Sequence, residues 1–339
     1  MMDHTRRKFA FFLAVGIVLT LAAALVSLTL GRFGASAGDV MRALASLVTD
    51  SQASDRLAGL VLEIRLPRIL LALLAGAGLA MAGAAFQSIF VNPLATPDTL
   101  GVASGSAFGA VVAILLGMPA LIVQFCALVC GLLAVAVVWA VSCSRGRTSM
   151  LMLILSGLVV AALFSALISL VKYLADPQDT LPTITFWMMG AMTGASMKAL
   201  ALSSPFVLVG CAALYLLRWK LNALSLSDEE AASLGIRVKW LRAIVITAAT
   251  MISAAVVSMC GLIGWVGLLV PHFVRLVTGN NNMRVMPASM VYGALFMLVC
   301  DTIARSACSL EIPVSILTAV IGAPVFLILL HRSPLTRRL

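Results

Sequence analysis

Few residues in this sequence have the type and the spacing that catalysis requires. A Walker A loop needs a Gly-Lys dipeptide to hold the phosphates of ATP, and the sequence contains none. The motif His-Glu-x-x-His, which carries zinc-protease chemistry, does not occur either. The sequence therefore predicts a protein that is not an enzyme and that holds neither a metal ion nor a cofactor of its own.

Three polar residues lie within or beside apolar sequence, where they could serve transport. Asp98 lies in a break between apolar runs, Asp301 lies near the end of another run, and His272 lies in a third. His272 could relay protons or bind a solute, but a lone histidine near a helix end more often has a structural role. A proton- or sodium-coupled transporter usually carries acids or histidines at the middle of its spans, and here the span centres lack charge. That class is the alternative, because backbone carbonyls also bind Na⁺.

The composition indicates that the chain lies in a membrane. Of 339 residues, 62% are hydrophobic and 11% are charged, whereas soluble proteins have about 45–50% and about 25%. A membrane-spanning helix needs about 20 apolar residues, and the length leaves room for ten. The seven cysteines are odd in number and lie mostly in apolar runs, so we interpret them as small core residues.

We predict an all-α, polytopic membrane protein that forms one domain over residues 1–339. The expected spans are 9–30, 64–86, 100–116, 119–142, 150–171, 200–217, 241–260, 262–277, 286–303 and 313–330. The segment 172–198 is too polar at its ends to cross, although it holds a short amphipathic piece at 184–192. Trp187 and the residues up to Gly194 could line an outer vestibule, or Trp187 could be an interfacial anchor.

The basic residues test this topology. With both termini in the cytoplasm, fifteen of the 23 Lys and Arg residues fall on the inside, the loop 144–147 included. This bias agrees with the positive-inside rule. The net charge of +10 is therefore explained by topology and requires no nucleic-acid partner.

The sequence from Arg65 to Gly109 predicts close helix packing beside a broken helix. Small residues recur every four positions at Gly76, Ala80 and Ala84, which lets another backbone approach. Asn92, Pro93 and the run 96–98 then interrupt the apolar pattern, and a second small-residue stripe follows at Gly101, Gly105 and Gly109. Such a break is either an ordinary turn between hairpin helices or part of a transport pathway.

One cytoplasmic stretch predicts a short surface helix within residues 224–236. Ser227 is a suitable N-cap, acids follow in the first turn, and Gly235 can end the helix. The helix is either a solvated surface element or a rigid element that receives motion from a separate ATPase.

Three sequence runs resemble one family. They are RLPR, GAGLAMAGAAFQ and NPLATPDTLGVASG between residues 65 and 105; GLIGWVGLLVPHFVRLVTG at 261–279; and DTIAR, EIP and GAPVF between 301 and 326. In order and spacing they resemble the membrane permease of the bacterial ABC importers for vitamin B12, haem and iron-siderophore complexes. The resemblance covers about residues 65 to 331.

The resemblance implies a permease in the bacterial cytoplasmic (inner) membrane with ten spans, broken helices and an inverted internal repeat. Its partners would be a second permease subunit, two ATPase subunits that bind the ATP, an extracytoplasmic binding protein and the lipid bilayer, with no nucleic acid. The cargo would be a metal chelate, with a ferric siderophore expected first and haem or cobalamin next.

The resemblance also implies site residues. Arg65, Arg68 and Arg305, at the outer ends of their helices, would form an exposed docking surface for glutamates of the binding protein. Contact with the ATPase is expected from Leu226, Asp228, Glu229, Ala231, Leu234 and Gly235. Packing and the pathway are expected to involve Asn92, Pro93, Gly101, Gly105, Gly109, Gly267, Pro271, His272 and Pro324.

Overall fold

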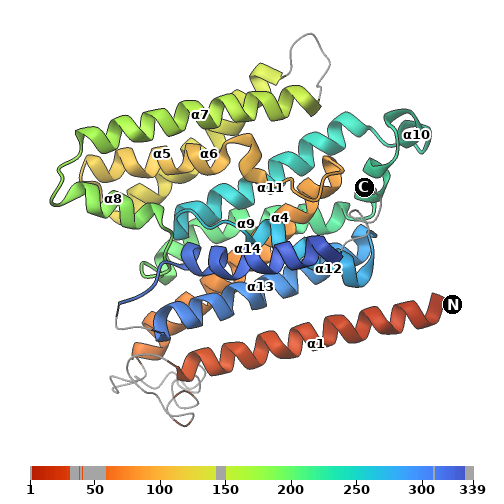
Figure 1. Ribbon diagram of the computed structural model, residues 1–339, viewed down its shortest axis with the longest axis horizontal. Coiled ribbons are helices and arrows are strands. Elements are labelled where there is room, and N and C mark those ends of the chain that lie inside the picture. The colour runs from red at the N-terminus through yellow and green to blue at the C-terminus, as the bar shows by residue number, and fades with distance from the viewer. Residues whose placement is uncertain are drawn as a thin grey trace.

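The computed structural model describes residues 2–30, 38, 40, 59–142, 150–307 and 310–332, and every regular element in these ranges is a helix (Figure 1). Ten apolar helices are present, seven of which are long enough to cross a membrane, while α5, α12 and α14 are shorter. The predicted all-α fold with about ten apolar helices is confirmed. The predicted loop at 144–147 lies outside the described residues.

The helix boundaries follow the predicted spans closely. The ten apolar helices are α1 (Met2–Thr29), α4 (Leu66–Ile89), α5 (Val102–Leu115), α6 (Ala120–Ser142), α7 (Met150–Leu174), α9 (Met197–Leu217), α11 (Val238–Cys260), α12 (Val266–Thr278), α13 (Asn282–Ser306) and α14 (Val314–Arg332). Shorter elements are the π-helix η1 (Leu60–Arg65), the 3₁₀-helices η2 (Pro97–Leu100) and η4 (Lys220–Ser225), and the helices α8 (Thr180–Met188) and α10 (Asp228–Ser233). Two helices begin before their apolar runs, because Arg and Lys are good helix formers in α1 and Asn281 caps α13.

Helix α4 lies in the middle of the bundle, with α7 on one side and α1 on the other (Figure 1). Its small residues explain this position. A Cβ added at Gly76 would clash with the carbonyl oxygen of Gly293 in α13, and one added at Gly83 would clash with that of Gly267 in α12. The backbones of three helices therefore touch at these glycines.

Two non-helical breaks interrupt the bundle. The first follows α4, where the Asn92 side chain accepts a hydrogen bond from the Leu94 amide and Gly101 adopts φ +75° before α5 begins. The second follows α11, where Gly261 has φ +71° and Trp265 has φ +68° before α12 begins. A positive φ at tryptophan is uncommon, and the packing of Trp265 against Gly322 holds it there.

The two breaks lie at opposite ends of the bundle. The first residues of α4 and the last residues of α11 line one cavity, whereas the last turn of α4 hydrogen-bonds to the start of α13 at the other end. Helices α4 and α11 thus run in opposite directions, as helices related by an inverted repeat do. We call the two ends the α8 end and the α10 end after the short helices that they carry.

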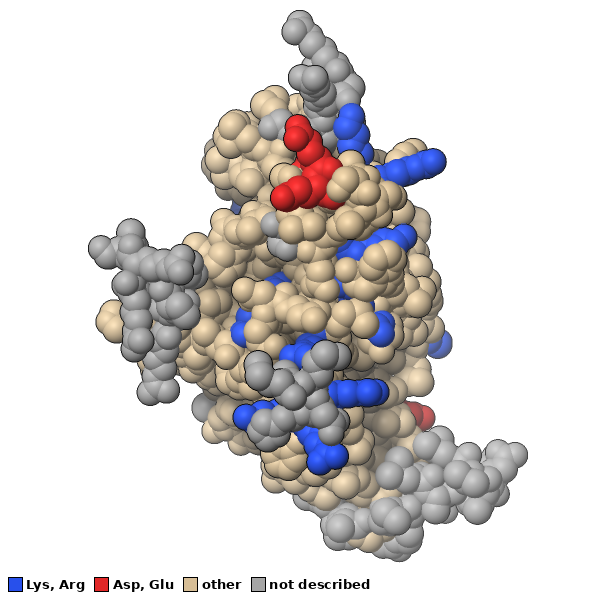
Figure 2. Space-filling view, turned by 90° about the vertical axis from the view of Figure 1, so that its right-hand side faces the viewer, with Lys and Arg blue, Asp and Glu red and all other residues tan. Residues whose placement is uncertain are grey.

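Both ends of the described chain lie at the α10 end (Figure 1). The last turn of α1 contacts Arg305 at the α8 end, and the amide of Val314 at the start of α14 donates to the Gly190 carbonyl there, so α1 begins and α14 finishes at the α10 end. Figure 2 shows this end, where Lys and Arg side chains are widespread and the acidic side chains gather mainly at one edge.

Candidate functional site

A buried cluster of charges joins three segments at the α8 end. The Nε and Nη2 atoms of Arg68 donate to the carboxylate of Asp301 at 2.9–3.1 Å, and its Nη1 donates to Glu311 at 2.9 Å. Asp301 is fully buried and Arg68 is 8% exposed. A buried carboxylate is tolerated when it is paired and hydrogen-bonded, so Arg68 compensates Asp301.

The other two arginines cap the end of α1. The guanidinium of Arg305 donates to the carbonyl oxygen and the hydroxyl of Ser27, and that of Arg65 donates to the carbonyls of Leu28 and Thr29. The last carbonyls of a helix lack partners within the helix, and cations are favoured at that end of its dipole. Arg65 and Arg305 thus complete the hydrogen bonding of α1.

The expectation that these arginines form an exposed surface is wrong. Arg65, Arg68 and Arg305 are 4%, 8% and 7% exposed. The sequence shows the positive charges but not their partners, because Asp301 and the α1 carbonyls are distant along the chain. Glu311, whose side chain is 28% exposed, is the accessible member of the cluster.

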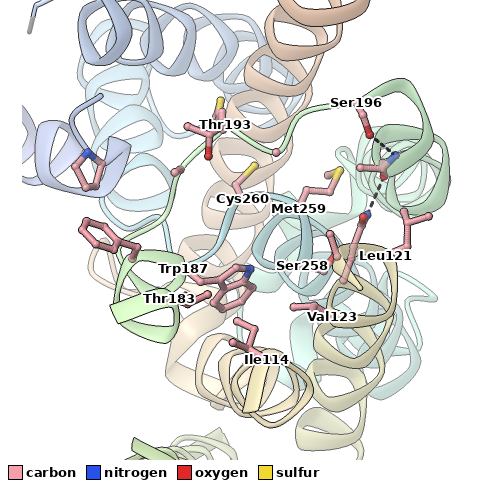
Figure 3. A pocket seen from close by; sticks show the side chains of 18 of the residues that line it. Ile114, Leu121, Val123, Thr183, Trp187, Thr193, Ser196, Ser258, Met259 and Cys260 are labelled. Atoms are coloured by element: carbon pink, nitrogen blue, oxygen red, sulfur yellow. Dashed lines mark hydrogen bonds between the residues drawn. The ribbon is translucent and has the colours of Figure 1, made fainter. Parts of the chain in front are cut away.

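Beside the cluster lies a cavity of about 880 Å³. Its wall combines residues from α5, α6, α8 and α11 with the segment between α8 and α9 (Figure 3). Trp187 and residues 191–194 belong to this wall, whereas residues 188–190 of the predicted vestibule segment do not. Arg68, Asp179, Lys198 and Glu311 give it charges of both signs.

Part of the cavity wall is a hydrogen-bonded contact between three helices. Gln124 of α6 donates through Nε2 to the Ser203 hydroxyl of α9 at 2.6 Å, and Ser203 lies 3.0 Å from the Ser258 hydroxyl of α11. Such bonds join helices in an apolar environment. Gln124 and Ser258 also face the cavity, which can therefore present both apolar and hydrogen-bonding groups to a solute.

At the opposite end, α10 has the predicted caps. The Glu230 amide donates to the Ser227 hydroxyl at 3.3 Å, and the Glu230 carboxylate accepts from the Ser227 amide at 3.0 Å, which completes a capping box. The carboxylate also accepts from the Ser227 hydroxyl at 2.9 Å. The hydrogen bonds to the carboxylate, first from the amide and then from the hydroxyl of Ser227, lower the pKa of Glu230. Gly235 ends the segment with φ +76°.

The surface that α10 presents differs in part from the expected one. Leu226 and Leu234 are 43% and 65% exposed, whereas Ala231 is 1% exposed. Ala231 packs into the core of this chain, so the expectation that it contacts the ATPase is wrong. Asp228 forms two hydrogen bonds of 2.7–2.9 Å with Arg242, which ties α10 to α11, and Glu229 stays exposed.

The glycines after the first break bring α5 against its neighbours. A Cβ at Gly105 would lie 2.5 Å from the Ala134 Cβ, and one at Gly109 would clash with the Cys126 carbonyl, both in α6. Gly101 lies against α7. Asn92 is exposed and Pro93 half-buried in the turn before them.

The remaining predicted pathway residues lie on α12 and α14. Gly267 packs against α4, Pro271 lies inside α12, and Pro324 lies exposed inside α14. His272 is 5% exposed, and its ring meets the Phe326 ring edge-on at 5.4 Å. Its Nε2 atom has no hydrogen-bond partner among the described residues. This apolar packing supports a structural role for His272.

Comparison with known proteins agrees with this architecture. The sequence pattern of the FecCD transport family matches residues 19–332. A molybdate import system permease protein of Haemophilus influenzae is 40% identical over 327 residues, which cover 96% of each chain. A proposed iron chelatin transport system permease protein of Helicobacter pylori is 39% identical over 81% of this chain and 83% of its own.

A solved structure shares the fold. It is described as an inward-facing conformation of a proposed metal-chelate type ABC transporter, and it superimposes with a TM-score of 0.86 at 38% identity over 95% of this chain and 99% of its own. The permeases of this family have no cofactor, and partner subunits hydrolyse the ATP. The chain therefore belongs to the FecCD transport family and is the multi-pass permease subunit of an ABC importer.

Proposed function

We propose that this permease imports a metal chelate, with a ferric siderophore as the first candidate cargo, and that it works with a second permease subunit, two ATPase subunits and an extracytoplasmic binding protein. The observation that carries this proposal is the placement of two features at opposite ends of one bundle. The cavity of about 880 Å³ lies at the α8 end, and the capped α10 with its exposed leucines lies at the other.

The α10 end faces the cytoplasm in this proposal, and the membrane is the bacterial inner membrane. The basic residues that Figure 2 shows at this end support that orientation, because cytoplasmic loops carry an excess of Lys and Arg. Both termini are then cytoplasmic.

The binding protein docks at the α8 end in this proposal. Arg65, Arg68 and Arg305 hold the ends of α1, α4 and α13 together there, and Glu311 is the accessible charge beside them. A partner carboxylate that approaches Arg68 would compete with Glu311 for Nη1, because that pair is the more exposed of the two that Arg68 forms. The arginines that would meet the binding protein are thus the same residues that hold these three helices together.

Molybdate is the second candidate cargo. It is favoured by the relative from Haemophilus influenzae, whose similarity covers 96% of both chains. Both cargoes are metal-containing solutes, and the cavity offers the cations Arg68 and Lys198 together with hydroxyl groups.

The test is uptake by proteoliposomes that contain the permease with its ATPase subunits. The binding protein is added outside the vesicles, and ATP is enclosed inside them. We expect uptake of radiolabelled iron as a ferric siderophore, and none when a non-hydrolysable analogue replaces ATP. Uptake of labelled molybdate but not of labelled iron would show that molybdate is the cargo in place of a ferric siderophore. Uptake that follows a proton or sodium gradient without ATP would overturn the proposal.

A further inference from the structure

A network of hydrogen bonds joins four elements at the α10 end. Asn222 lies in η4, the segment that directly precedes α10. Its Oδ1 accepts from the backbone amide of Asn282 at 2.8 Å, and its Nδ2 donates to the Asn281 side chain at 3.0 Å. Both partners lie at the start of α13, so η4 is attached to α13 in two places.

The network continues from α13 to α4 and α12. Oδ1 of Asn282 accepts from the Ser88 hydroxyl of α4 at 2.8 Å and from Nη2 of Arg275 in α12 at 3.4 Å. Arg275 also donates to the Ser88 hydroxyl at 2.8 Å and to the Ala84 carbonyl at 3.1 Å. Asn282 is therefore the residue at which η4, α4 and α12 meet.

The centre of the network is buried, whereas the hydrogen bond between Asn222 and Asn281 at its η4 end is exposed. Asn282 is 4% exposed and Ser88 is 9% exposed, and η4 itself is anchored by Leu221 and Leu224, which are 0% and 2% exposed. Hydrogen bonds are stronger where water is excluded, and a buried polar group that loses its partner is costly. A displacement of η4 therefore has to move its partners with it.

We propose that Asn222, Asn282, Ser88 and Arg275 are positioning residues that relay movement of α10 to the inner ends of α4 and α12. The inference rests on the proposed function, since α10 has to be the element that the ATPase moves. Helices α4 and α12 also touch at Gly83 and Gly267, and α4 leads directly into the first break. The relay thus connects the ATPase contact with the segment that interrupts the membrane span.

A second connection from α10 allows a comparison. Asp228 bonds to Arg242 of α11, but the Asp228 side chain is 64% exposed, and exposed ion pairs contribute little because water and salt screen them. The network around Asn282, whose centre is buried, is therefore expected to carry most of the coupling, and the pair Asp228–Arg242 little of it.

The test measures molecules of cargo imported per ATP hydrolysed by the reconstituted complex, with co-purification of the ATPase as the measure of assembly. Asn222→Ala and Ser88→Ala should each lower this ratio at least about fivefold, in the range of coupling found for contacting residues in one network, while the complex assembles. Ser88→Thr keeps the hydroxyl and should restore the ratio. Thr278→Ala is the matched control, because among the described residues the Thr278 hydroxyl bonds only to carbonyls at the end of its own helix.

The double variant distinguishes a relay from two separate defects. If the residues act in one chain, Asn222→Ala combined with Ser88→Ala should lower the ratio no further than either change alone. The relay would be overturned if the double variant lowered the import ratio by the product of the two single effects. It would also be overturned if the single variants kept the wild-type ratio. If Ser88→Ala fails to assemble, Arg275→Lys takes its place in the double variant, because it keeps the charge and loses the guanidinium that donates to Ser88 and Ala84. A wild-type complex that hydrolyses ATP without import contradicts the proposed function instead.

Discussion

At the scale of single residues, the buried arginines show what charge alone can predict. The motif RLPR identified Arg65 and Arg68 as residues that need a reason to lie where they do. It could not identify Asp301 as a partner, because the two residues of that pair are 233 positions apart. Nor could it indicate that Arg65 would cap α1, since a helix end presents backbone carbonyls whatever its side chains are.

The unequal burial of the two carboxylates on Arg68 predicts unequal costs of removing them. Arg68→Ala leaves Asp301 buried without its main partner, so we expect a loss of about 3–5 kcal/mol in stability. Glu311→Gln removes a partly exposed pair and should cost about 0.2–1 kcal/mol. Thermal unfolding of the purified permease in detergent measures both. Equal melting temperatures for the two variants would contradict the conclusion that Arg68 is needed to compensate the buried charge of Asp301.

At the scale of elements, local sequence signals predicted the short helix and the first break well. Ser227 and Glu230 have the spacing of a capping box, and the asparagine and the prolines that follow α4 in close succession are typical of a turn. The face of α10 was predicted less well. Ala231 is buried because η4 and α11 pack against it, and a six-residue helix has too few apolar positions to show its inner face in the sequence.

The exposed leucines predict where the ATPase contacts α10. In a background without native cysteines, Leu226→Cys and Leu234→Cys should each form crosslinks to cysteines placed in the ATPase cleft. Ala231→Cys is the matched control and should form none, because this position is 1% exposed. Crosslinks confined to the loop at 144–147 would show that another segment receives the ATPase.

The glycines of α5 predict a packing defect. Gly105→Leu places a side chain where a Cβ alone would lie 2.5 Å from the Ala134 Cβ, and overpacking of this kind typically costs about 1–3 kcal/mol. We expect less folded permease in the membrane, measured by fluorescence-detected size exclusion. Gly264→Ala is the control, because an added Cβ there meets nothing within 4 Å. Normal yield and transport by Gly105→Leu would show that this face of α5 meets lipid.

At the scale of the whole molecule, the number of spans was predictable and their arrangement was not. Hydropathy fixes which segments leave water, so all ten spans appear near their expected positions. Hydropathy does not distinguish α1 from α4, although α1 is mostly exposed and α4 is mostly buried. The small-residue stripe of α4 was the signal for its enclosure, but only the structure shows that α13 and α12 are the helices that enclose it.

The central position of α4 has a consequence for how the protein is made. Gly76 of α4 packs on Gly293 of α13, so the two contacting backbones are 217 positions apart in the sequence. At the usual synthesis rate of about 5–20 residues per second, α4 spends roughly 10–40 s in the bilayer before its partner exists. During that interval the helix presents its small-residue face to lipid or to the insertion machinery. Chains truncated before residue 293 are therefore expected to retain an unassembled α4 and to be the forms that membrane proteases remove first.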